Sequence, residues 1–135
     1  MTVRRCTSWS SVAAALGLIV VTFTSASAQT RQTQRVMQDK LAVSSRLLAA
    51  LVTSKWEVLD KQARALEALT DQPGWDPLRL PEYAAQTAAF RRANMALIEA
   101  AGSRDQRTAV TAYNGLVAAC VECHRYVARA RIAGK

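Results

Sequence analysis

The sequence predicts an all-α protein, an antiparallel up-down-up-down four-helix bundle. Three observations support this fold class. The chain has 135 residues, of which half are apolar and 21% are charged, a composition typical of one globular domain. It holds only five Gly and three Pro, which favours helices over a turn-rich β-sandwich. Four segments with apolar residues at 3/4 spacing follow one another through short connections.

The first 28 residues are predicted to be a cleaved secretory signal peptide. Arg4 and Arg5 precede an apolar stretch over 12–23, and an Ala-Ser-Ala sequence ends at Ala28. An uncleaved membrane anchor is the alternative, but the apolar stretch is short for one. Cleavage leaves residues 29–135 as a periplasmic domain without a membrane span. That domain has 16 basic and 10 acidic residues, a net charge of +6, and no longer contains Cys6.

The first two helices of the domain are predicted over 30–52 and from Ser54 to just before Asp71. We expect the first to bury a stripe of Met37, Leu41, Ser44, Leu48 and Leu51. Ser54 and Glu57 have the spacing of a capping box at the start of the second. Its expected buried stripe is Trp56, Leu59, Ala63, Leu66 and Leu69.

The third helix is predicted to start at Pro81, which suits a first helical position, and to stop at Gly102. The fourth is predicted to open at Ser103, with Gln106 completing a second capping box. The expected stripe of the third is Tyr83, Thr87, Phe90, Asn94, Leu97 and Ala101. That of the fourth is Val110, Tyr113, Val117, Cys120, His124 and Val127.

The fourth segment contains Cys-x-x-Cys-His, the attachment motif for c-type haem, from Cys120 to His124. Thiols at positions i and i+3 of a helix are spaced to form thioethers with the two vinyl groups of one haem. His124 directly follows Cys123, so its imidazole can reach the iron from the same side. The sequence thus predicts one covalent haem c, with His124 as the proximal axial ligand.

Other uses of two neighbouring cysteines fit this sequence less well. Redox-active Cys-x-x-Cys pairs lie at helix N-termini, whereas this pair comes late in its predicted helix. A zinc site needs two further ligands, and no other Cys or His follows the predicted cleavage site. A helical periplasmic binding module with a Cys120–Cys123 disulfide is the remaining alternative without haem.

The position of the motif resembles class II c-type cytochromes, the cytochrome c′ group. Those four-helix bundles carry one haem motif near the C-terminus, and here His124 lies 11 residues before the end. The resemblance implies that Cys120 and Cys123 hold the haem and that His124 is its proximal ligand. One departure is that the family has an aromatic residue three and an Arg four positions after the His, whereas Tyr126 and Arg129 stand at +2 and +5. Members are often dimers, so the resemblance also allows a homodimer.

Met37 is the favoured distal axial ligand, because only one His is present. In an up-down-up-down bundle, the start of the first helix is level with the end of the fourth. His124 lies ~12 Å from that end and Met37 roughly 6–10 Å, whereas Met95 lies ~21 Å away. The family also takes its distal residue from the start of the first helix. The alternative is that Met37 only fills the core.

The leading functional prediction is a mono-haem carrier of single electrons rather than an enzyme, since no acid/base pair or substrate site is visible. A five-coordinate binder of nitric oxide or carbon monoxide is the alternative, with Met37 off the iron. The positive charge favours redox partners with acidic docking patches, and the scattered basic residues argue against nucleic acid. Three basic residues can pair with haem propionates or simply form a solvated basic face: Lys40, Arg125 and Arg129. Four aromatic residues can line the haem pocket or the core: Trp56, Phe90, Tyr113 and Tyr126.

Overall fold

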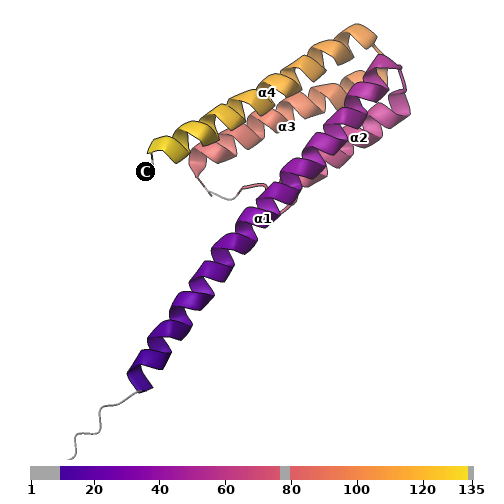
Figure 1. The fold of residues 1–135 in the computed structure, drawn as a ribbon. Helices are drawn as coiled ribbons and strands as arrows, with labels where there is room; N and C mark the ends of the chain where they lie inside the picture. Colours follow the sequence, from indigo (N-terminus) through magenta and orange to yellow (C-terminus); the bar gives the residue numbers. More distant parts are fainter. Residues whose placement is uncertain (1–9, 77–79, 134–135) are drawn as a thin grey trace, which may run out of the picture.

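The protein is all-helical over the residues that its computed structural model describes, 10–76 and 80–133, with side chains described for 28–76 and 80–130. No strand occurs in these ranges, so the predicted all-α class is confirmed. Four α-helices and one short 3₁₀ segment follow in order (Figure 1): α1 Ser10–Val52, α2 Trp56–Ala68, η1 Leu69–Asp71, α3 Pro81–Ser103 and α4 Gln106–Ala133.

The turn between α1 and α2 lies beside the turn between α3 and α4. The Ser54 hydroxyl donates a hydrogen bond to Gln106 Oε1 at 3.0 Å, and the Gln106 amide donates to the carbonyl of Leu51 at 3.0 Å. An ion pair of 2.6 Å joins Arg104 and Glu57 at the same end. From there α1 and α4 diverge (Figure 1), and α1 packs chiefly on α2 while α4 packs chiefly on α3.

The core lies between these helices, and two of the predicted stripes are confirmed. On α2, Leu59, Ala63 and Leu66 are fully buried, and Trp56 packs against the core, as does Leu69 at the start of η1. On α3, Tyr83, Phe90, Asn94, Leu97 and Ala101 are buried, and Thr87 is half-buried. α3 begins at Pro81, as predicted, because proline lacks the amide that a first helical residue leaves unbonded.

The stripe predicted for α1 is confirmed at Leu51 and is wrong by one residue at its other positions. Leu41 and Leu48 are 70% and 46% exposed, and Met37 and Ser44 are only half-buried. The buried residues of α1 are Val36, Lys40, Val43, Leu47, Ala50 and Leu51. A single residue corresponds to a rotation of ~100° about the helix axis, so a different face meets α2 and α3.

The stripe predicted for α4 is confirmed only in part: Tyr113, Cys120 and Val127 are half-buried and pack against the core, but the other three residues do not. Val110 and Val117 are 42% and 44% exposed, and His124 is also exposed. The buried residues are Ala109, Ala112 and Leu116, which are small enough for α4 to approach α3 closely. α1 and α4 therefore both leave apolar side chains uncovered.

Both predicted capping boxes are also wrong, because the serines help to end the preceding helices. Ser54 and Arg104 have positive φ values of 52° and 54° and follow the ends of α1 and α3. The next amides, of Lys55 and Asp105, bond back to the carbonyls of Ala50 and Ala100, which closes each helix in a Schellman motif. Gly102 lies inside α3 rather than ending it.

α1 is longer than the predicted helix over 30–52, and its N-terminal part extends beyond the other helices (Figure 1). The helix continues through the expected cleavage site after Ala28, so processing stays a prediction. Arg4, Arg5 and Cys6 lie outside the described residues. Within the ranges given above, no helix combines the length and the apolar character needed to cross a membrane.

Candidate functional site

The haem-type motif lies in the second half of α4, where the helix has moved away from α1. Cys120 and Cys123 are half-buried, and both thiols are free. His124 is exposed. The helix places Cys120 and His124 one turn apart on the same side, since residues i and i+4 are neighbours on a helix surface.

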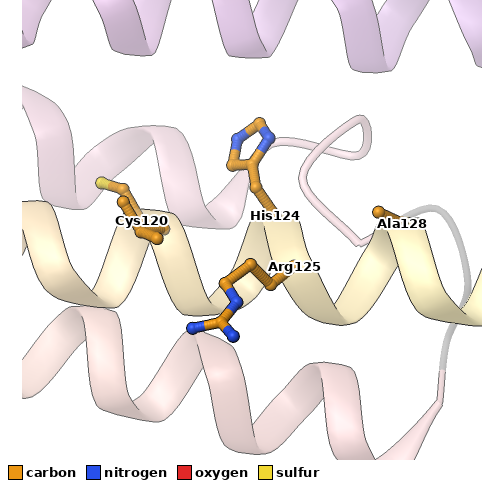
Figure 2. Close-up of a pocket in the computed structure, with 5 residues that line it drawn as sticks. Cys120, His124, Arg125 and Ala128 are labelled. Carbon is orange, nitrogen blue, oxygen red and sulfur yellow. The ribbon is translucent and has the colours of Figure 1, made fainter.

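Cys120 and His124 line an open groove of about 400 Å³ on α4. Val121, Arg125 and Ala128 complete its lining. In Figure 2 the Cys120 and His124 side chains project from the same edge of α4, and Arg125 projects from the other side. The structure thus brings one thiol and the imidazole to a shared, accessible surface.

Cys123 does not line this groove. In the interior lies a group of buried residues that we call the Lys40 cluster: Lys40, Trp75, Tyr83 and Phe90. Lys40 Nζ lies 4.3 Å from the ring centroid of Phe90 and 4.6 Å from that of Trp75. The two rings are themselves in contact, with centroids 5.0 Å apart and planes at 50°. The Tyr83 hydroxyl donates a hydrogen bond to the Trp75 carbonyl, so the cluster joins α1, the loop after η1 and α3.

Burial and nearby charges shift the pKa values of Cys123 and Tyr83. Burial raises the pKa of the Cys123 thiol above its ordinary value, Cys120 adds to the rise, and the positive charge of Lys40 opposes it. Burial also raises the pKa of Tyr83, with smaller contributions from Cys123 and Asp76.

The two methionines differ in their surroundings. Met37 is half-buried and packs against the core from α1, but it does not line the groove of Cys120 and His124. Met95 is 47% exposed on α3. The prediction that Met37 lies centrally on the buried stripe of α1 is wrong, because Val36 and Lys40 occupy that stripe.

The three basic residues that could pair with haem propionates differ in their exposure to solvent. Arg125 lines the groove and forms an exposed ion pair with Glu122 at 3.0 Å, and Arg129 is exposed. For Lys40 the solvated-face interpretation is wrong, since its side chain is buried with only 7% exposed. Among the four aromatic candidates Phe90 is buried, and the other three are half-buried and pack against the core.

Sequence reasoning missed the burial of Lys40 and the part played by Trp75. A signal for the first was present: Val36, Val43, Leu47 and Ala50 are apolar at 3/4 spacing, and position 40 fills the gap in that stripe. Trp75 was harder to find, because it lies in a loop that has no periodicity.

No family model, curated protein or solved structure matches the chain. In the part of the chain that the structure describes, no three His, Cys, Asp or Glu side chains come together as a metal site. A haem does not need such a cluster, because its porphyrin supplies four of the iron ligands. The candidate donor set is the two thiols and the one imidazole of α4.

Proposed function

We propose that the protein is a mono-haem c-type cytochrome of the periplasm that carries single electrons and is not an enzyme. Cys120 and Cys123 would hold the haem as thioethers, His124 would be its proximal ligand, and the helices would form an antiparallel up-down-up-down bundle. One observation carries the proposal: two free thiols lie three residues apart on one helix, with an exposed imidazole beside them on the groove of Cys120. When bound, the haem would supply reversible one-electron chemistry.

The surroundings of the motif fit a large apolar group. Val117 and Val121 are 44% and 49% exposed next to the groove on α4, and Leu41 and Leu48 are exposed on α1. Exposed apolar residues on two diverging helices are costly in water. A porphyrin attached at Cys120 and Cys123 would cover part of this surface.

The charges near the motif fit the proposed partners. Arg125 and Arg129 are exposed on the same part of α4, and the predicted mature domain is basic overall. A basic surface beside a redox centre would speed encounter with acidic redox partners at low ionic strength. A homodimer is compatible with this arrangement.

Haem attachment is tested by exporting the protein, with its signal, from a bacterial host that matures c-type cytochromes. We expect the band on a denaturing gel to stain for haem and the stain to be lost in the double variant Cys120→Ser/Cys123→Ser. Cys6→Ser is the matched control and should keep the stain, because Cys6 lies in the predicted signal peptide. An unstained wild-type band would overturn the proposal in favour of a helical module without haem.

The distal ligand is tested by absorption spectra of the oxidised, reduced and CO-treated protein. With Met37 on the iron, we expect a low-spin spectrum with a weak sulfur-to-iron band, unchanged by CO. Met37→Ala should then give a high-spin protein that binds CO. Met95→Ala is the control and should keep the wild-type spectrum, because Met95 is exposed on another helix.

One observation favours the second candidate, a five-coordinate binder of nitric oxide or carbon monoxide. Met37 lies at the edge of the buried face of α1 and outside the groove that holds His124. A wild-type protein that is high-spin and binds CO rapidly would select this function over electron transfer.

A further inference from the structure

Two exposed stripes of residues, one on α1 and one on α4, have the spacing with which helices pack side by side. In each stripe the successive steps along the chain are four, three and four residues. This is the period of about 3.5 residues that presents a continuous seam to another helix. We call these eight exposed residues the paired seam: Leu41, Ser45, Leu48 and Val52 on α1, and Val110, Asn114, Val117 and Val121 on α4.

The surface around the paired seam carries very little charge. No residue from 108 to 121 is charged, and from 41 to 53 only Arg46 is. Arg46 is held by α2, where its Nε donates to Gln62 Oε1 at 2.9 Å. The exposed surfaces of α2 and α3 instead carry charges of both signs, among them Glu57, Lys61, Arg64, Arg92 and Glu99. Because solvated helix faces normally carry such charges, the uncharged stripes indicate a surface that another molecule covers.

Most of the paired seam lies outside the groove of Cys120 and His124. Of its eight residues, only Val121 lines that groove. At the opposite end, Val52 and Val110 lie near the two turns that are joined by the hydrogen bond between Ser54 and Gln106. The site proposed for the haem therefore does not account for this surface.

The exposed apolar area is large enough for a specific contact between two chains. Six residues of the paired seam are Leu or Val, and their exposed fractions lie between 42% and 70%. Together they expose roughly 500 Å² of apolar surface, which is comparable with the largest apolar patch on a typical monomer. Two such surfaces would bury about 1,000 Å² when they meet, the area that a specific interface needs.

The charge of the chain favours a second copy as the molecule that covers the paired seam. The net charge is +8, so contact through most of the surface would bring like charges of two copies together. The paired seam avoids this repulsion, because all eight of its residues are uncharged. An acidic partner, in contrast, would find no cation there to pair with.

We propose that two copies of the chain form a symmetric dimer in which the paired seam of one copy packs against that of the other. In such an interface the same surface serves both copies, so every contact is made twice and the assembly closes at two chains. The inference concerns α1 and α4 outside the groove and does not depend on haem.

The test is the molar mass of the exported protein, measured by analytical ultracentrifugation at about 100 μM, above the micromolar dissociation constants of weak interfaces. We expect the mass of two chains. Leu48→Glu and Val110→Glu each place an unpaired carboxylate in the interface and should raise the dimer dissociation constant about hundredfold or more. Val58→Glu is the matched control and should keep the wild-type mass, because Val58 is 42% exposed, like Val110, but lies on α2.

Salt provides a second measurement that needs no variant. An interface without charges should keep the wild-type dimer intact when NaCl is raised from about 0.05 M to about 0.5 M, since salt screens only charge interactions. Dissociation to one chain over this range would contradict a contact through the paired seam.

Other results would also contradict the inference. A wild-type mass of one chain would leave the paired seam to a different protein or to a membrane, and a dimer weakened equally by Val58→Glu and Val110→Glu would place the contact elsewhere. If a glutamate variant does not accumulate, the double variant Leu48→Ser/Val110→Ser decides: weakening by about tenfold or more supports the inference, and wild-type affinity contradicts it. Haem staining of the same samples tests the proposed function separately, because neither result requires the other.

Discussion

Gly74 shows how one residue positions the Lys40 cluster. A Cβ at this position would lie 2.7 Å from the carbonyl oxygen of Gln32 and 3.0 Å from the amide nitrogen of Thr33. Only glycine therefore lets the loop after η1 approach the backbone of α1 so closely. Trp75 follows directly, and its indole N–H donates to the Thr87 hydroxyl at 2.9 Å. The loop thus carries Trp75 to Lys40.

We expect Gly74→Ala to lower the free energy of unfolding by about 1–3 kcal/mol, because the added methyl group meets backbone that cannot move freely. Urea denaturation of the purified protein measures this change. Gly115→Ala is the matched control: nothing lies within 4 Å of its Cβ position on α4. There alanine should raise stability by roughly 0.5–1 kcal/mol through helix propensity. Equal effects of the two substitutions would contradict the close approach at Gly74.

At the scale of elements, Asp105 is the residue that caps α4. Its Oδ1 accepts hydrogen bonds from the amides of Arg107 at 2.9 Å and Thr108 at 3.1 Å. Its Oδ2 accepts one from the Thr108 hydroxyl at 2.8 Å. The Thr108 hydroxyl, followed by the Thr108 amide, lowers the pKa of the Asp105 carboxyl below its ordinary value. The charged form of Asp105 is therefore favoured in the folded protein.

This lowered pKa gives the cap a predictable pH dependence. Its contribution to stability is present above the unfolded-state pKa of about 3.9 and is lost as pH falls through the lower folded-state pKa. Asp105→Asn keeps a capping oxygen without the charge. We expect the wild type to have the higher Tm at pH 7 and the difference to shrink below about pH 4. A difference that stays constant down to pH 2 would show that the charge of Asp105 does not act in this way.

The helix faces also belong to this scale. The 3/4 spacing of apolar residues on α1 is compatible with two neighbouring stripes, one that contains Ser44 and one that contains Lys40. The structure buries the second, because Trp75 and Phe90 provide aromatic faces for the Lys40 ammonium. On α4, close packing on α3 selects the face with Ala109 and Ala112. In α1 and α4, the residues packed against the helix determined which face is buried, and the periodicity of the helix's own sequence did not.

At the scale of the whole molecule, α1 is much longer than its partners. Its N-terminal part extends beyond α2, α3 and α4 (Figure 1) and includes most of the predicted signal peptide. Removal of residues 1–28 would leave the first helix starting close to where the loop residue Gly74 meets Gln32. The packed part of the molecule would then be intact.

We expect intact-mass spectrometry of the exported protein to give a chain that begins at Gln29 and carries one haem. An Ala28→Arg variant should accumulate with its signal attached, because signal peptidase needs a small residue before the cleavage site. Ala42→Arg, at an exposed position of α1, is the control and should be processed normally. A wild-type mass that includes residues 1–28 would contradict the assignment of this segment as a cleaved signal.

Features that depend on neighbours along the chain could be predicted from the sequence alone. These are the all-helical class, the start of α3 at Pro81, the buried stripes of α2 and α3, and the placement of Cys120 and His124 on one side of α4. Helical periodicity and the restricted backbone of proline act over a few residues, so they can be read locally. The haem itself remains a prediction of the motif.

Other features depended on the tertiary structure. These are the faces that α1 and α4 bury, the interior position of Lys40, and the place of Met37 at the edge of the buried face of α1. The tertiary structure also brought the two turns together, since the Ser54 hydroxyl bonds to Gln106, 52 residues away in the chain. Burial and long-range hydrogen bonds depend on surfaces from other helices. A stripe of 3/4 spacing is therefore compatible with more than one rotation of a helix, and packing against those surfaces selects one.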